Sequence, residues 1–338
     1  MKYATLGELM LRLSTPGYER FVQAKSFDVN YGGGEANVAV SLCNFGEEAK
    51  FISKFPNNDI GDAARNSLRE YGVDTSDILR GGERLGIYYL ETGDSIRPSK
   101  VVYDRAHSSI AEAKASEFNF RKALKGCEWL HVTGITPALG KNAQQITLKA
   151  LKTAHEMGIT VSFDLNFRAK LWTKEEAQAC MIPLMEYVDY VIGNEEDAEA
   201  CLGFKSGSDV ASGKIDADGY GPMLKAMCEK FHLKGAASSL RESHSANDNG
   251  WSGVLYTKGK FYKSAHYELR IVDRVGGGDS FAAGLIYGLS HYEDPEKAIN
   301  FAVANSAFKH TIPGDYNHAS VKEVEGLMAG NTTGRVQR

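Results

Sequence analysis

Three successive glycines and an acid within residues 273–284 have types and spacing suited to phosphoryl transfer. Gly276, Gly277 and Gly278 directly precede Asp279 and an apolar helical pattern. At the start of a helix, glycines let backbone N–H groups turn toward a negatively charged ligand, which the helix dipole also favours. A carboxylate placed there gains little unless it takes a proton from a substrate hydroxyl. The stretch therefore predicts an anion hole with Asp279 as the base. The alternative is a glycine turn with Asp279 as a helix N-cap.

A second glycine cluster precedes another helical pattern near the N-terminus. It comprises Gly32, Gly33 and Gly34, and Asn37 follows three residues later. Backbone without side chains lets a ligand approach closely, and the asparagine amide can bind hydroxyl groups or fix the loop. One such cluster is weak evidence, but two in one chain favour a ligand site over two ordinary turns.

Short apolar runs alternate with amphipathic segments along most of the chain. The runs predict strands over 3–8, 51–55, 129–134, 160–166, 190–194 and 236–240. The periodic segments predict helices over 36–45, 60–71, 142–157, 174–187, 223–232, 280–291, 295–309 and 321–328. This alternation predicts a doubly wound α/β fold, in which helices flank both faces of a mostly parallel sheet. Ligands bind beyond the carboxyl ends of such strands. Polar residues gather at those ends, namely Glu8, Asp164, Asn166, Arg168 and Asn194.

Two segments, 11–31 and 85–110, lack a helical period and contain alternating β-formers. We expect them to form a small separate β-sheet that acts as a lid over the strand ends. No linker or repeat divides the chain, so residues 1–330 are expected to form one domain and residues 331–338 a flexible tail.

The charge balance points to small molecules as partners. The chain has 39 Lys and Arg residues against 43 Asp and Glu residues, a net charge of -4. No basic cluster is long enough for a nucleic acid or a membrane surface, and no apolar run approaches the ~20 residues of a membrane span. We therefore expect a cytoplasmic protein that binds neither. The nine histidines show no ligand spacing, which argues against a transition-metal site.

The two glycine stretches resemble, in order and spacing, the two signatures of the ribokinase-like (PfkB) carbohydrate kinases. The similarity runs from Tyr3 to about Asp315. It implies ATP-dependent phosphorylation of a sugar hydroxyl, with Asp279 as base, Gly276–Gly278 as anion hole and Mg²⁺ bridging the phosphates. It also admits K⁺ as a further cofactor.

The resemblance assigns further residues to ATP and Mg²⁺. Residues 194–197 are similar to an Asn-x-x-Glu motif that helps to place Mg²⁺ and phosphate, although Asp197 replaces the usual Glu and Glu196 is expected to share its role. Many family members carry a Lys-x-Gly segment where this chain has residues 238–251. We interpret Arg241 as the residue that supplies the missing cation and the residues after it as a long polar loop. The residues expected to contact the nucleotide are Asn166, Arg168, Asn194, Arg241, Gly276, Gly278 and Asn305.

Arginine and tyrosine side chains indicate the kind of sugar. Tyr103 and Arg105 share one face of a lid strand, Tyr89 is expected to reach that face from the neighbouring strand, and Arg168 follows a sheet strand. Two guanidinium groups suit a carboxylate, although for either one alone a surface salt bridge is the alternative.

Residues 101–105, 133–139 and 164–172 resemble the family branch whose substrate is 2-keto-3-deoxygluconate, a sugar acid. That resemblance implies transfer of phosphate to the C6 hydroxyl of 2-dehydro-3-deoxy-D-gluconate. It assigns substrate contacts to Gly33, Gly34, Asn37, Tyr89, Tyr103, Arg105, Ile135, Arg168, Asp279 and Asp315.

Other interpretations stay open from sequence alone. A kinase for a neutral ketose such as fructose leaves the two arginines unexplained, and a non-catalytic sugar sensor leaves Asp279 unexplained. The sequence does not separate gluconate-derived from galactonate-derived acids. Edge strands in an exposed lid favour a homodimer formed through the lid.

Overall fold

The computed structural model describes residues 1–207, 216–331 and 334. Its main sheet contains β1 (Lys2–Leu6), β4 (Glu48–Phe55), β5 (Ile78–Arg80), β8 (Trp129–Thr133), β9 (Thr160–Asp164), β10 (Tyr190–Ile192), β11 (Gly235–Ser243), β12 (Asp248–Thr257), β13 (Lys260–Lys263) and β14 (Tyr267–Arg270). Within the described residues these form a 10-stranded sheet in the order β13-β12-β11-β10-β9-β8-β1-β4-β5, with β14 paired to β12. The strands from β11 to β5 are parallel, whereas β12, β13 and β14 pair antiparallel.

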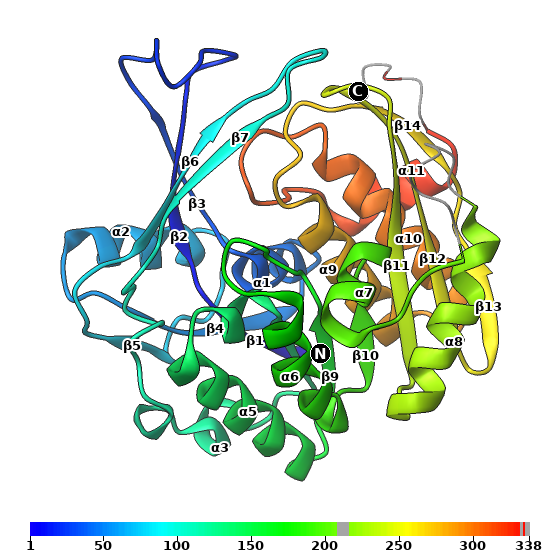
Figure 1. Ribbon diagram of the computed structural model, residues 1–338, viewed down its shortest axis with the longest axis horizontal. Coiled ribbons are helices and arrows are strands. Elements are labelled where there is room, and N and C mark those ends of the chain that lie inside the picture. The colour runs from blue at the N-terminus through cyan, green and yellow to red at the C-terminus, as the bar shows by residue number, and fades with distance from the viewer. Residues whose placement is uncertain (208–215, 332–333, 335–338) are drawn as a thin grey trace.

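Helices cover both faces of this sheet (Figure 1). They are α1 (Gly34–Asn44), α2 (Asp59–Arg69), α3 (Phe120–Ala123), α4 (Ile135–Ala138), α5 (Lys141–Glu156), α6 (Lys174–Leu184), α7 (Glu195–Leu202), α8 (Tyr220–Phe231), α9 (Gly277–His291), α10 (Pro295–Lys309) and α11 (Val321–Met328). One hydrophobic cluster lies under α5, α6 and α8, and a second lies under α1, α9 and α10. Burial of apolar side chains on both faces stabilises the sheet and explains why its central strands are continuous apolar runs. The predicted α/β class is confirmed.

The lid is a separate 4-stranded sheet in the order β3-β2-β6-β7. Its strands are β2 (Met10–Ser14), β3 (Asp28–Gly32), β6 (Gly86–Glu91) and β7 (Lys100–Asp104), drawn in blue and cyan in Figure 1. The predicted lid segments 11–31 and 85–110 supply these strands. The predicted tail, residues 331–338, lies almost wholly outside the described residues.

The strand register decides which lid side chains face the strand ends. Tyr88 pairs with Tyr103, and Tyr89 pairs with Val102. Directly paired residues share one face of a sheet and successive residues alternate. The expectation that Tyr89 shares a face with Tyr103 is therefore wrong, and Tyr88 lies there instead. Tyr89 packs on the opposite face against Phe27, with ring centroids 5.8 Å apart.

The residues after Arg241, interpreted from sequence as a long polar loop, belong to a β-hairpin. β11 and β12 pair antiparallel from Gly235↔Thr257 to Ser243↔Asn249, and Arg241 lies opposite Trp251. The sequence pattern was misleading because residues near the hairpin tip, among them Arg241, Ser243 and Asp248, are polar and exposed and interrupt the apolar run that would indicate a strand.

Candidate active site

A cavity of about 400 Å³ lies where the lid, the carboxyl ends of the parallel strands and the start of α9 meet. Its wall contains most of the residues that the sequence singled out: Gly33, Gly34, Asn37, Tyr103, Arg105, Ile135, Asn166, Arg168, Asn194, Asp197, Arg241, Gly276, Gly278, Asp279 and Asp315. Segments almost 300 positions apart in sequence therefore meet at one site.

Three predicted residues do not line the cavity. Tyr89 points to the other face of the lid. Gly277 lies against the ring of His310, which a β-carbon at Gly277 would approach to 2.5 Å. Asn305 is fully buried and its amide binds the Ser280 carbonyl and Asn317. The expected nucleotide contact of Asn305 is therefore wrong, because its amide links α9 to α10 instead.

The anion hole is built at the first turn of α9. Gly276 is the N-cap residue with φ of +83°, a conformation that glycine adopts without strain. A β-carbon at Gly278 would meet nothing within 4 Å, so its backbone is open to the cavity. Backbone N–H groups of a first helical turn have no intrahelical acceptor. The Gly277 amide donates to the Arg274 carbonyl at 3.3 Å, whereas the backbone of Gly278 borders the cavity, where an anion would satisfy it.

Asp279 is the third residue of α9 and makes no capping bond, so the N-cap alternative is wrong. The amide nitrogen of Asn37 donates to its carboxylate at 2.6 Å. A β-carbon at Gly34 would lie 3.4 Å from Asp279 Oδ1, which places the two glycine stretches against the same acid. Burial raises the pKa of Asp279 to about 6, although the Asn37 bond and the charge of Arg168 oppose the rise. Such a carboxylate is ionised at neutral pH and more basic than usual, as a general base requires.

Two further carboxylates lie on the same wall. Asp164 is buried at the end of β9, and burial together with Asp197 and Asp279 raises its pKa well above the ordinary value. Asp197 forms a capping box with Asn194 at the start of α7, and it also accepts from the Phe167 amide at 2.9 Å. Glu196 is exposed and outside the cavity, so it does not share the role of Asp197.

These carboxylates fit a divalent cation. Within the described residues, none of Asp164, Asp197 and Asp279 forms an ion pair with a lysine or arginine. Mg²⁺ prefers oxygen ligands and usually keeps several waters while it binds phosphate oxygens. An acidic wall beside an anion hole suits that mode of binding. No cluster of three or more His, Cys, Asp or Glu ligands occurs in the part of the chain that the structure describes.

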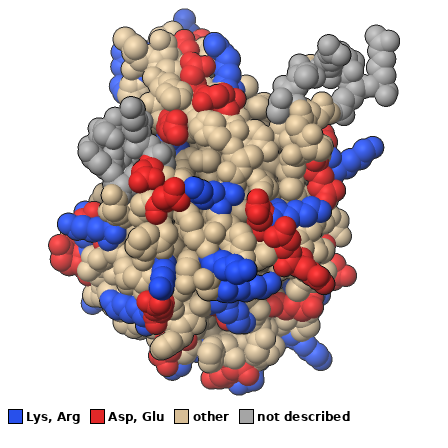
Figure 2. Space-filling view, turned by 90° about the vertical axis from the view of Figure 1, so that its right-hand side faces the viewer, with Lys and Arg blue, Asp and Glu red and all other residues tan. Residues whose placement is uncertain are grey.

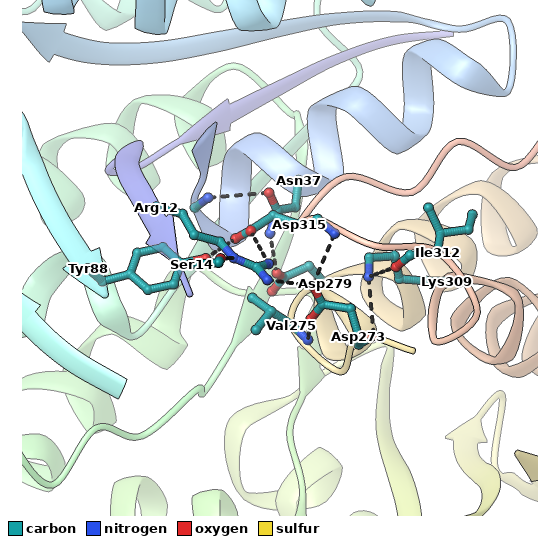
Figure 3. A network of polar contacts seen from close by, with 12 residues as sticks. Arg12, Ser14, Asn37, Tyr88, Asp273, Val275, Asp279, Lys309, Ile312 and Asp315 are labelled. Carbon is teal, nitrogen blue, oxygen red and sulfur yellow. Dashed lines mark hydrogen bonds and ion pairs between the residues drawn. The ribbon is translucent and has the colours of Figure 1, made fainter. Parts of the chain in front are cut away.

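The sequence did not indicate Arg12, which is buried behind the cavity and binds one of its wall residues, Asp315 (Figure 3). This buried arginine donates to Asp315 at 2.8 Å, to Asp273 at 2.5 Å and to the Ser14 hydroxyl at 2.7 Å. The Tyr88 hydroxyl donates to the second oxygen of Asp315 at 2.5 Å. Arg12 therefore joins the lid to the loop before α9 through Asp273, and Arg12 and Tyr88 join it to the loop after α10 through Asp315. Strand alternation was the available signal, because it places Arg12 and Tyr88 on one face.

The two arginines expected to bind a carboxylate differ in their surroundings. Arg105 is buried; its Nε donates to Glu8 at 2.9 Å, its Nη2 contacts the same oxygen, and Ser108 binds the other oxygen of Glu8. Its guanidinium lies over the Tyr103 ring, 5.4 Å from the centroid. Arg168 donates only to the Phe167 carbonyl, and it forms no ion pair among the described residues. Glu8 thus fixes Arg105, whereas Arg168 keeps most of its donors available.

Two further arginines, Arg241 and Arg274, line the cavity. Arg241 is exposed on β11, and its charge lowers the pKa of Arg274, which is also lowered by burial. Arg274 donates to the Ala246 carbonyl at 2.8 Å. Neither forms an ion pair within the described part of the chain, so an anion would relieve their repulsion. Sequence reasoning also missed Trp251 and His310, whose rings lie 4.6 Å apart on this wall.

No described helix is long and apolar enough to cross a bilayer. Basic and acidic side chains are interspersed on the face drawn in Figure 2.

Residues 2–321 match the model of a family described as pfkB family carbohydrate kinase. The chain belongs to this family. The kinase is thus a phosphotransferase that acts on an alcohol group, in a family that uses ATP. The family predicted from the two glycine stretches is confirmed.

The kinase is similar over its whole length to proteins of known name. A crystal structure of 2-dehydro-3-deoxygluconokinase from Thermotoga maritima is 52% identical, covers 98% of this chain and 100% of that one, and superposes with a TM-score of 0.95. The 2-dehydro-3-deoxygalactonokinase of Haloferax volcanii is 31% identical over 98% of this chain and 97% of its own length. The 2-dehydro-3-deoxygluconokinase of Bacillus subtilis is 26% identical over 94% and 92%.

Proposed function

We propose that this kinase transfers the γ-phosphoryl group of ATP to the C6 hydroxyl of 2-dehydro-3-deoxy-D-gluconate, giving the 6-phosphate. The observation that carries the proposal is the presence of Arg105 and Arg168 in the same cavity as Asp279. Planar guanidinium groups match carboxylate geometry, so an acid held by them presents its far hydroxyl to the base. The 52% identity to a 2-dehydro-3-deoxygluconokinase supports the same acceptor.

In this mechanism Asp279 takes the proton of the acceptor hydroxyl while Asn37 holds its carboxylate in place. The backbone at Gly276 and Gly278 receives the transferring phosphoryl charge, and Arg241 and Arg274 bind the phosphates of ATP. Asp164, Asp197 and Asn194 would hold Mg²⁺ through its waters. When bound, Mg²⁺ neutralises phosphate charge. The lid excludes water that would otherwise hydrolyse ATP.

The proposal is tested by measuring ADP release with a panel of acceptors. The panel contains both C4 epimers of the 2-keto-3-deoxy hexonic acid, fructose, pentoses and nucleosides. We expect the gluconate-derived acid to give the highest kcat/KM. Preference for the galactonate-derived epimer, the substrate named for the Haloferax relative, would change the stereochemistry alone. Preference for fructose would favour a neutral-sugar kinase, and the absence of turnover with every acceptor would favour the sugar sensor.

Arg241→Ala is expected to raise the KM for ATP or lower turnover, and to leave the KM for the sugar acid nearly unchanged. The reason is that Arg241 lines the cavity and supplies a cation with no ion-pair partner among the described residues. Steady-state kinetics with each substrate varied in turn give the answer. Arg270→Ala is the matched control, because Arg270 is exposed on neighbouring β14 and lies outside the cavity. An ATP dependence identical to wild type would assign Arg241 to the surface.

We also propose that residues 1–330 act as one kinase domain that dimerises through the outer face of the lid. The register places Val29, Leu13, Tyr89 and Val102 in one row across that face. Val29 is 61% exposed and Val102 is 52% exposed at the two ends of this row, so the row presents apolar side chains to solvent. Val29→Lys with Val102→Lys is expected to convert a dimer to a monomer in light-scattering measurements. A monomeric wild type would contradict this assembly.

A further inference from the structure

A fully buried lysine lies beneath the anion hole and takes no part in the mechanism above. Lys309, the last residue of α10, is 0% exposed. Its ammonium donates to the backbone carbonyls of Ile312 at 3.1 Å and Asp273 at 3.4 Å, as Figure 3 shows. A β-carbon at Gly276 would lie 3.3 Å from Lys309 Cε, so the side chain packs directly under the N-cap of α9.

The charge of Lys309 is not consumed by a salt bridge. Among the described residues no carboxylate oxygen lies within ion-pair distance of its ammonium. Burial lowers the pKa of Lys309 below its ordinary value, and the more distant charges of Asp273, Asp315 and Asp279 only partly oppose that effect. Burying a lysine is costly, and an apolar side chain would fill the same space at lower cost. The position is therefore explained by the charge itself rather than by packing.

The ammonium lies where it can order the loop before the anion hole. It binds the Asp273 carbonyl, and the carboxylate of the same residue accepts from the amides of Val275 and Gly314, each at 3.0 Å. The ammonium is a monovalent cation bound by backbone carbonyl oxygens, the type of ligand that also binds K⁺. Its charge also opposes the rise in the pKa of Asp279 and the negative charge of the phosphoryl group.

We propose that Lys309 is a positioning residue whose ammonium serves as a built-in monovalent cation for the anion hole, so that this kinase needs no K⁺. The proposal rests on the kinase activity and on any acceptor that the panel identifies. It answers the question of K⁺ that the family resemblance left open.

The test compares turnover in choline, Na⁺, K⁺ and NH₄⁺ chlorides at one ionic strength. Wild-type kcat is expected to vary by less than about twofold, because its cation is covalently attached. Lys309→Ala removes the charge and leaves space, so we expect kcat in choline to fall by about 10- to 100-fold, as for loss of one preorganised charge-stabilising group. NH₄⁺ and K⁺ should restore most of that loss, Na⁺ less, with the KM for the sugar little changed.

Two further variants make the result specific. Lys309→Met fills the space without charge, so it should lose kcat and gain nothing from any cation. Lys50→Ala removes another buried lysine, which lies on β4 outside the cavity and pairs with Asp77 and Asp74. The turnover of this variant should not respond to the added cation. If Lys309 had only a structural role, the turnover of Lys309→Ala, like that of Lys50→Ala, would not respond to the added cation.

The outcomes separate this proposal from the proposed acceptor. Inactivity of wild type on the sugar acid, with activity on another sugar, overturns the acceptor and leaves the cation test intact with that sugar. Activation of wild type by K⁺ of more than about threefold overturns the built-in cation. So does full turnover of Lys309→Ala in choline, or its failure to respond to NH₄⁺. If Lys309→Ala does not fold, the proposal is decided by the dependence of wild-type kcat on the added cation and by the kcat of Lys309→Met.

Discussion

Asp279→Asn is expected to lower kcat by about 10²–10⁴-fold, the usual effect of removing a positioned general base, while leaving both substrates bound. Asparagine has nearly the shape of aspartate, so the first turn of α9 and the contact with Asn37 can persist. What it lacks is the ability to take the proton of the acceptor hydroxyl. Calorimetric binding of the sugar and of ADP separates this loss from misfolding. Retention of more than about a tenth of wild-type turnover would contradict the assignment of Asp279 as base.

The pH profile gives the same prediction a second readout. Because the pKa of Asp279 is raised to about 6, its base form is present above that pH and is lost as the pH falls through it. Wild-type kcat/KM should therefore decline on the acid side near pH 6, and the residual rate of Asp279→Asn should lack that decline. Glu35→Gln is the control, because Glu35 is a buried carboxyl whose pKa is raised to about 7 and which binds Thr133 and Thr136. Loss of the decline in Glu35→Gln would assign it to Glu35.

Arg168→Ala is expected to lower kcat/KM for the 2-keto-3-deoxy acid by roughly 10- to 150-fold and that for fructose hardly at all. A charge-assisted hydrogen bond contributes about 1.5–3 kcal/mol, which corresponds to that range. The ratio of the two kcat/KM values isolates recognition of the carboxylate from catalysis. An unchanged ratio, or a wild type that prefers fructose, would make the neutral-ketose kinase the better interpretation.

Arg105→Ala should lower the same ratio and also destabilise the fold. Its removal leaves the buried Glu8 carboxylate without its cation, and breaking a buried ion pair typically costs about 3–5 kcal/mol. Thermal unfolding therefore distinguishes the two variants, since Arg168 has no such partner in the described residues. Arg84→Ala is the matched control on the lid, because Arg84 pairs with Asp104 near the surface and lies outside the cavity. Its ratio should equal that of wild type.

Most of the fold could be predicted from the local pattern of apolar and polar residues. The predicted helix 295–309 has the bounds of α10, and the predicted strand 51–55 lies within β4, because hydrophobic periodicity reports directly on burial. The antiparallel edge formed by β12, β13 and β14 was missed, since β13 and β14 are short and partly exposed and the mostly buried β12 begins with polar residues. Glycine stretches located the site for a similar reason. Backbone that must approach a ligand or adopt positive φ, as at Gly276, leaves a mark in the sequence.

What the sequence could not provide was the partner of each charge. Alternation along a strand places Tyr88 and Tyr89 on opposite faces of the lid but does not say which face each one takes. Only the pairing of β6 with β7 shows that Tyr88 shares a face with Tyr103. Arg12 looked like any polar residue of an alternating strand, because its carboxylate partners lie hundreds of positions away. The buried environment of Lys309 likewise arises from α10 packing under the loop before α9. Tertiary contacts of this kind leave no local period to detect.

The ion pairs of Arg12 also constrain the order in which the molecule can assemble. Arg12 is separated from Asp273 by 261 positions and from Asp315 by 303. Strand β2, which carries Arg12, can therefore form these ion pairs only after nearly the whole chain has been made. The intervening βα units can form earlier, because their contacts are local. An arginine buried without its carboxylates is strongly disfavoured, so β2 gains its final position only after the segment around Asp315 has left the ribosome. The two walls of the cavity therefore mature together in one late step, and unfinished chains carry no half-built phosphoryl-transfer site.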